Sequence, residues 1–163
     1  MKKNYDFIWI NLLTLVLGII AFYSFDKKFE VFYAILATGI SISIGYRHYK
    51  IENDKLFKEL FTEFNEKYDT KFNNELSKIH NQYMVNPNYQ LTENDNQLVI
   101  DYINLCAEEY LWYTKGRIDE SVWKNWENGM KFYLNIEPIK KCFINEESQK
   151  DSYYGLFSRL NIT

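Results

Sequence analysis

Two adjacent glutamates and a basic corner that follows them are the residues best placed for chemistry in this 163-residue chain. The candidate set comprises Glu108, Glu109, Trp112, Lys115, Arg117 and Trp123. Successive residues of a helix point about 100° apart, so Glu108 and Glu109 cannot act as a carboxylate pair on one substrate. One of them is predicted to bond to Arg117. In the alternative arrangement the whole set lines a ligand pocket, in which an aromatic face near the arginine could stack a base.

Signatures of common active sites are missing from the sequence. There is no glycine-rich phosphate loop, no Ser-x-x-Lys and no His or Cys cluster with metal-ligand spacing. The two histidines, His48 and His80, lie in a membrane-proximal segment, where a headgroup contact and a helix-end charge explain them more simply than catalysis does. We therefore expect no enzyme activity, no catalytic or metal-binding residue and no cofactor.

The elements that position these residues begin with two uncharged apolar stretches, Phe7 to Phe25 and Val31 to Tyr46. The first has 19 residues and would span roughly 28 Å as a helix, close to the thickness of the hydrocarbon core of a bilayer. The second has 16 and needs its flanking aromatic rings at the headgroup level to span. A five-residue connection makes them antiparallel neighbours. The sequence predicts a transmembrane hairpin over residues 1–46.

A signal peptide or a buried helical hairpin of a soluble protein would also contain an apolar block. No small-x-small cleavage site follows Ser24, and neither stretch has the polar face of a surface helix. Lysine and arginine residues set the orientation. Lys2 and Lys3, together with three basic residues after the second stretch, outnumber Lys27 and Lys28 in the turn. We expect a multi-pass protein of the inner membrane with both termini in the cytoplasm.

The second apolar stretch carries small or weakly polar residues at most helical turns. Ala34, Thr38, Ser41 and Gly45 recur at spacings of four, three and four, so they form one stripe on a helix. The stripe either packs against the first helix of the same hairpin or forms a contact between protomers. A third interpretation is a pore lining in which Thr38, Ser41 and Ser43 face water. The alternation around Ser41 also has a strand period, but a lone strand in lipid would leave its backbone unpaired.

The remaining 117 residues suffice for one soluble domain. They contain 15 Lys and Arg against 19 Asp and Glu, a net charge of −4, which argues against general nucleic-acid binding. Cys106 and Cys142 are not spaced as a Cys-x-x-Cys pair, and we expect free, buried thiols. The frequent use of Asn, Lys, Ile and Tyr is common in AT-rich bacterial genomes, so we expect a bacterial protein.

Apolar residues recur at threes and fours from Arg47 to Tyr83, without proline or glycine, and predict a long linker helix over 47–84. Pro87 ends it, and Thr92 with Asp95 resembles a capping box that opens a central helix stopped by Gly116. A further helix should start at 118–119, and two short ones at Pro138 and at 150–152. The fold class predicted is an all-α membrane protein: hairpin, long membrane-proximal helix and a small cytosolic helical bundle at 90–163.

Residues 101–126 resemble a pattern in small bacterial membrane proteins of unknown function. The pattern is N-x-x-E-E starting at Asn104, an aromatic run, and then G-x-I-D-E starting at Gly116. In layout the chain is similar to membrane effectors of bacterial antiviral systems, both CRISPR-associated and nucleotide-gated. Some of those carry an R-x(4-6)-H nuclease site, and this chain departs from it, because no histidine follows any arginine at that distance.

Two functions of different classes follow from these features. The first is an oligomeric membrane effector, a tetramer or a larger ring, whose cytosolic domain senses a nucleotide or protein activator and gates or perturbs the bilayer in antiphage defence. The second is a membrane tether that presents a helical interaction domain without pore activity. The small-residue stripe and the uninterrupted linker helix favour the effector, because a flexible linker would serve a tether better.

Overall fold

The computed structural model describes residues 5–162, apart from the side chains of Tyr5 and Lys150. Every regular element in that range is a helix, which confirms the all-helical prediction. The chain divides into two compact units, Met1–Lys55 and Leu56–Thr163. The second unit therefore begins inside the stretch that the sequence assigns to a linker helix. Lys2 and Lys3, on which part of the predicted orientation rests, lie outside the described residues.

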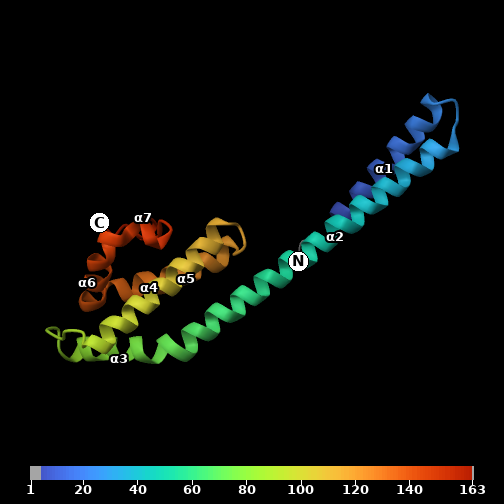
Figure 1. Ribbon diagram of the computed structural model, residues 1–163. Coiled ribbons are helices and arrows are strands. Elements are labelled where there is room, and N and C mark those ends of the chain that lie inside the picture. Colours follow the sequence, from blue (N-terminus) through green and yellow to red (C-terminus); the bar gives the residue numbers. More distant parts are fainter. Residues whose placement is uncertain (1–4, 163) are drawn as a thin grey trace. The chain divides into compact units, whose positions relative to one another are not determined.

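The first unit is a helical hairpin. Helix α1 (Tyr5–Ser24) lies antiparallel beside the first part of helix α2 (Phe29–Lys67), as Figure 1 shows in blue. The turn between them is tighter than predicted, because Phe29 and Glu30 already belong to α2. Asp26 and Lys27 make the reversal with φ angles of 51° and 58°. Left-handed backbone at two successive residues allows the chain to turn within so few residues.

The two hairpin helices meet along a seam of small and polar residues, defined here by Asn11, Thr14, Gly18, Gly39 and Ser43. The Asn11 amide donates to the Ser43 hydroxyl oxygen at 2.9 Å, and Ser43 is 1% exposed. Gly39 lies so close to α1 that a Cβ there would collide with the side chain of Thr14. At the open end of the hairpin, Lys50 Nζ lies 2.7 Å from Asp6 Oδ2. The seam thus combines close backbone approach with a polar bridge.

Both helices of this unit are long and apolar enough to cross a membrane. Their best windows have mean hydropathies of 2.1 and 1.4 and bury 6% and 11% of their residues. Large apolar side chains such as Leu13, Ile20 and Ile42 are more than half exposed. The contacts along the seam leave most of this apolar surface uncovered within the hairpin.

The second unit is a bundle around one hydrophobic core. Its elements after α2 are η1 (Tyr68–Phe72), α3 (Asn73–Val85), α4 (Glu93–Thr114), α5 (Glu120–Leu134), α6 (Glu137–Glu146), η2 (Glu147–Tyr153) and α7 (Leu156–Leu160). Helix α4 packs against α3, α5, α6 and α7, so it is the central helix that the sequence predicts. Cys106 and Cys142 are free and buried, as expected.

The boundaries of α4 follow from local chemistry. The Thr92 hydroxyl accepts from the Asp95 backbone N–H, and the Asp95 carboxylate accepts from the Thr92 backbone N–H, which confirms the predicted capping box. At the other end Gly116 adopts a φ of 68°, a conformation that favours glycine and ends the helix. Pro138 lies in the first turn of α6, at the start predicted for this helix. The last helix instead starts at Leu156 after Gly155 (φ 87°), because residues 147–153 form a 3-10 turn.

The predicted linker helix continues from the first part of α2 to Val85 as one helical run, and a π-helical turn lies inside it. Residues Tyr68–Phe72 form a π-helical turn in which the Asn73 backbone N–H donates to the Tyr68 carbonyl, five residues back. Such a turn accommodates one residue more than an α-turn and rotates the face that follows. Phe64, Phe72, Leu76 and Ile79 remain buried on both sides of it. The π-turn therefore keeps the apolar face of the helix packed on the core and changes the direction in which Tyr68 points.

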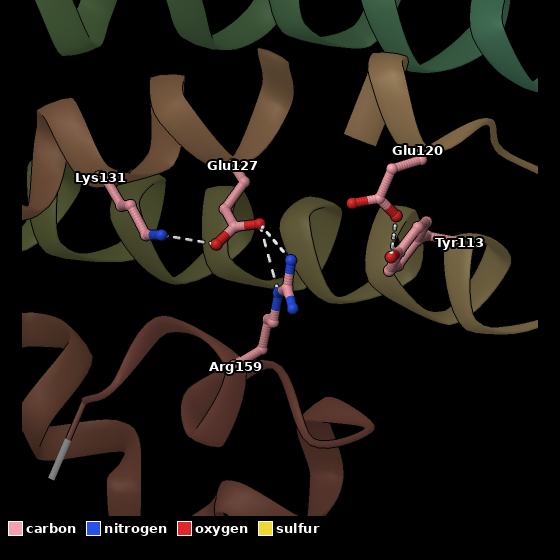
Figure 2. Close-up of polar contacts among 5 residues, drawn as sticks. All are labelled: Tyr113, Glu120, Glu127, Lys131 and Arg159. Atoms are coloured by element: carbon pink, nitrogen blue, oxygen red, sulfur yellow. Dashed lines mark hydrogen bonds and ion pairs between the residues drawn. The ribbon is translucent and has the colours of Figure 1, made fainter. Parts of the chain in front are cut away.

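A buried carboxylate ties α7 to α5. Glu127 of α5 accepts from Arg159 of α7 through Nε at 3.2 Å and through a terminal guanidinium nitrogen at 2.8 Å, and from Lys131 at 2.5 Å (Figure 2). Nearby, the Tyr113 hydroxyl donates to Glu120 and links α4 to the start of α5 (Figure 2). Burial raises the pKa of Glu127, but the hydrogen bonds from Lys131 and Arg159 outweigh it and lower that pKa below its ordinary value.

Glu127→Gln is expected to lower the free energy of unfolding by about 1–2 kcal/mol at neutral pH, since both cations are more than a third exposed and rehydrate in part. A depressed pKa means that the wild-type advantage exists above the ordinary carboxyl pKa and is lost as the pH falls through the folded value. Urea denaturation at neutral and acid pH measures both effects. Glu59→Gln, an exposed position on α2, is the control, and an equal loss in both variants would contradict this role for Glu127.

Candidate functional site

The predicted stripe on α2 does not pack against α1. Ala34, Thr38, Ser41 and Gly45 are all exposed, whereas the seam uses Gly39 and Ser43. The interpretation in which the stripe joins the two helices of one hairpin is therefore wrong. The physical reason is that Asn11 and Thr14 of α1 offer a hydrogen bond and a close approach at Gly39 and Ser43. The stripe stays uncovered within the hairpin.

The hydroxyls of the stripe bond within their own helix. Thr38 Oγ1 donates to the Ala34 carbonyl and Ser41 Oγ to the Ala37 carbonyl, both at 2.9 Å. Hydroxyls satisfied in this way are compatible with lipid or with a close helix contact. Ser43, which the pore-lining interpretation places in water, is instead buried in the seam. It is corrected from a pore candidate to a structural residue of the hairpin.

The charged set around residues 108–123 does not converge on one pocket. Glu108 is exposed, and its carboxylate lies 3.8 Å from the ammonium group of Lys67. Its ion pair in the structure is therefore with Lys67 and not the predicted one with Arg117. Lys115 lies over the Trp112 ring, 5.0 Å from its centroid. Trp123 is fully buried against Tyr110 and Tyr113, with ring centroids 5.2 and 5.0 Å away. It is a core residue, and no base can stack on it.

Glu109 has a different environment from its neighbour. It is 6% exposed and lines a cavity of about 180 Å³ between the end of α2, η1, α4 and α5. The lining residues are Asn65, Tyr68, Tyr102, Glu109, Asn125, Trp126, Gly129 and Met130. Tyr102, Glu109 and Met130 are buried and form the floor, and the exposed residues Asn125 and Gly129 mark the mouth. We call this the Glu109 cavity.

Aromatic side chains make up much of its wall. The rings of Tyr68 and Tyr102 lie 6.3 Å apart, and the hydroxyl of Tyr68 lies 3.1 Å from that of Tyr133. Trp126 packs on Phe64, with ring centroids 5.9 Å apart. Tyr68 is the first residue of the π-turn. π-turns are rare and occur frequently at functional sites. The π-turn beside the cavity is therefore a second indication, separate from the shape of the cavity, that this is a functional site.

The Glu109 carboxyl is held neutral in the absence of a partner. Burial, and after it the charge of Glu108, raises the pKa of Glu109 to about 8. None of the lining residues carries a positive charge. Burial likewise raises the pKa of the Cys106 thiol well above its ordinary value, so this cysteine is not an activated nucleophile. Among the described residues no group of three or more His, Cys, Asp or Glu side chains could hold a metal ion.

Sequence reasoning singled out Glu109 but not the neighbours that surround it. Apart from Tyr102 on the same helix, its cavity partners lie more than 40 residues before it, on α2 and η1, or about 16 to 21 residues after it, on α5. The one local signal is the apolar coverage of α4, which extends around more than half of the helix and includes the Glu109 face. A glutamate on such a face has to be buried, and that could have directed attention to it.

Comparisons with protein-family models, with curated proteins and with solved structures give no match for this chain. The resemblance to small bacterial membrane proteins therefore stays a prediction. Two features of the geometry bear on function, namely the uncovered face of α2 and the Glu109 cavity.

Proposed function

We propose that this protein is an oligomeric effector of the bacterial inner membrane. In the proposal the hairpin α1–α2 crosses the bilayer with both termini in the cytoplasm. Hairpins of several protomers pack through the α2 stripe, Ala34, Thr38, Ser41 and Gly45, and the helical unit responds to a signal by altering that assembly. The exposure of the whole stripe in a hairpin that already has its own seam is the observation that carries the proposal.

The two faces of α2 differ in what they contact, and this difference supports an assembly. A hairpin needs one face for its own partner helix, and the seam at Gly39 and Ser43 meets that need. In lipid, small residues on a second face gain nothing from contact with acyl chains, but they allow helix backbones to approach closely. Ile40, Ile42 and Ile44 alternate with the small residues and are more than half exposed. In the proposal these isoleucine side chains face the lipid that surrounds the interface between protomers.

The soluble unit supports a sensing role. It has its own core and a cavity with an unpaired buried carboxyl, Glu109, whose charge depends on what occupies the cavity. A site of this kind can bind one conformation of a protein better than another and so shift an equilibrium. A role in antiphage defence is the predicted context of that response, and infection of cells with and without the protein would test it.

The expected effect on cells is a loss of membrane potential when the protein is overproduced. Ser41→Leu should abolish the depolarisation, because a bulky side chain on the stripe blocks the protomer contact without touching the seam. Leu13→Ile, on the exposed lipid-facing side of α1, is the matched control and should depolarise like the wild type. A potential-sensitive dye in growing cells measures the effect. If no depolarisation occurs with any of the three proteins, the chain is a tether and the proposal fails.

A further inference from the structure

The Glu109 cavity has the shape of a small-molecule site. Its volume of about 180 Å³ exceeds the roughly 150 Å³ of an engineered cavity that admits benzene. It is open at Asn125 and Gly129, so a ligand can enter from solvent. A Cβ built on Gly129 meets nothing within 4 Å, which shows that the space beside this glycine is free.

At the floor of the cavity lies a carboxyl without a partner. Glu109 is buried, and among the described residues it forms no hydrogen bond or ion pair. Buried carboxyl groups in proteins are nearly always paired, because an unpaired one forfeits its hydration. The lining supplies no lysine, arginine or histidine to pair with it. Any partner of this carboxyl therefore comes from outside the chain, as water in the cavity or as a bound ligand.

The chemistry of the lining selects the charge of that partner. No lysine, arginine or histidine lines the cavity, so nothing in the lining attracts the phosphates of a nucleotide, and an ionised Glu109 would repel them. Tyr68, Tyr102 and Trp126 offer aromatic rings, and Met130 a polarisable thioether. Rings grouped around a carboxylate are the arrangement that recognises organic cations, since ring faces attract a cation that has shed its water.

We propose that the Glu109 cavity binds a small organic cation, an alkylated ammonium group whose charge pairs with Glu109 and whose methyl groups contact Tyr68, Tyr102 and Trp126. This inference rests on the cavity alone and does not depend on the membrane proposal. It identifies the chemical class of a ligand, and the π-turn that begins at Tyr68 is the element that completes its wall.

Binding is coupled to a proton. A bound cation favours the ionised carboxylate, so Glu109 releases its proton when the ligand enters, and affinity rises as the pH rises toward about 8. Glu108 is the charged group that acts on Glu109, and the charge of Glu109 in turn contributes to raising the pKa of Tyr102 and Cys106, all on α4. Tyr68 of η1 also lines the cavity, and burial raises the pKa of its hydroxyl. The lining residues from α5 are all uncharged.

The test uses the full-length protein in detergent with two probes of nearly equal shape, choline and its uncharged analogue 3,3-dimethylbutan-1-ol. Isothermal titration is expected to give choline a dissociation constant on the order of 1 mM or tighter. The alcohol should bind at least about tenfold more weakly, because it lacks the charge. Titration of choline in buffers with different ionisation enthalpies should also reveal release of a proton.

Three variants assign the binding to this cavity. Glu109→Gln should weaken choline binding at least about tenfold, whereas Glu59→Gln, at an exposed position on α2 outside the cavity, should leave it unchanged. Gly129→Leu keeps the carboxyl but fills the free space, so it should abolish binding even if Glu109→Gln does not fold. The proposal is overturned if choline and the alcohol bind equally, if neither binds, or if choline binding survives Gly129→Leu in a folded protein. Depolarisation of cells by the unliganded protein is a separate readout, so failure here leaves the membrane proposal standing.

Discussion

Gly39→Leu is expected to drive α1 and α2 apart, whereas Gly45→Leu should leave the hairpin closed. At Gly39 even a Cβ would meet Thr14 Cβ at 2.6 Å, so the helix backbones themselves have to separate. At Gly45 a Cβ meets nothing within 4 Å. Overpacking of this kind typically costs about 1–3 kcal/mol. The Asn11–Ser43 hydrogen bond is lost along with the close approach.

Pulsed electron spin resonance on the full-length protein measures this difference. Spin labels at the exposed positions Leu13 and Ile40 report the distance between the two helices. We expect a longer and broader distance distribution in Gly39→Leu and an unchanged one in Gly45→Leu. Equal distributions in the two variants would show that the seam does not hold the hairpin together.

Glu109→Gln is expected to raise the free energy of unfolding at pH 7 by about 1–3 kcal/mol and to flatten its dependence on pH. The pKa of Glu109 is raised to about 8 in the folded protein, against an ordinary value of 4.5. Between these values the unfolded chain is ionised while the folded chain holds a proton, so the wild-type protein loses stability as the pH rises. Glutamine cannot ionise, so the variant does not lose this free energy of unfolding. The buried amide of glutamine has a cost of its own, which makes the net gain smaller.

Thermal and urea unfolding followed by tryptophan fluorescence, without added ligand, check this at about pH 5 and pH 7. Between these pH values the free energy of unfolding of the wild type should fall by roughly 2 kcal/mol more than that of Glu109→Gln. Glu59→Gln, at an exposed position on α2, should follow the wild type. If Glu109→Gln proved less stable than the wild type at both pH values, Glu109 would be a paired carboxylate and not a neutral one.

The sequence predicts this fold well wherever the determinants are local. The Thr92–Asp95 capping box and the stop at Gly116 place α4 to within a residue or two at each end, because caps depend only on neighbouring side chains. The π-turn at Tyr68–Phe72 has no such signal. The three- and four-residue spacing of apolar side chains continues through it, and only packing within the bundle decides where the extra residue is accommodated.

The candidate site could be predicted only in part for the same reason. Helix geometry shows that Glu108 and Glu109 point in different directions, and in the structure one is exposed and the other buried. It does not show which distant residues meet Glu109, so Tyr68 and Trp126 were missed. On α2 the small-residue pattern marks two faces, and only the polar residues of α1, Asn11 and Thr14, distinguish the seam from the stripe.

The mass of the full-length protein in a mild detergent tests the central claim most directly. Native mass spectrometry of the wild type is expected to give a single closed assembly, a tetramer or a larger ring. Gly45→Leu, which leaves the hairpin seam intact, is expected to give monomers. A wild-type protein that is strictly monomeric under these conditions, or a Gly45→Leu variant that assembles as the wild type does, would contradict the proposal that the α2 stripe joins protomers.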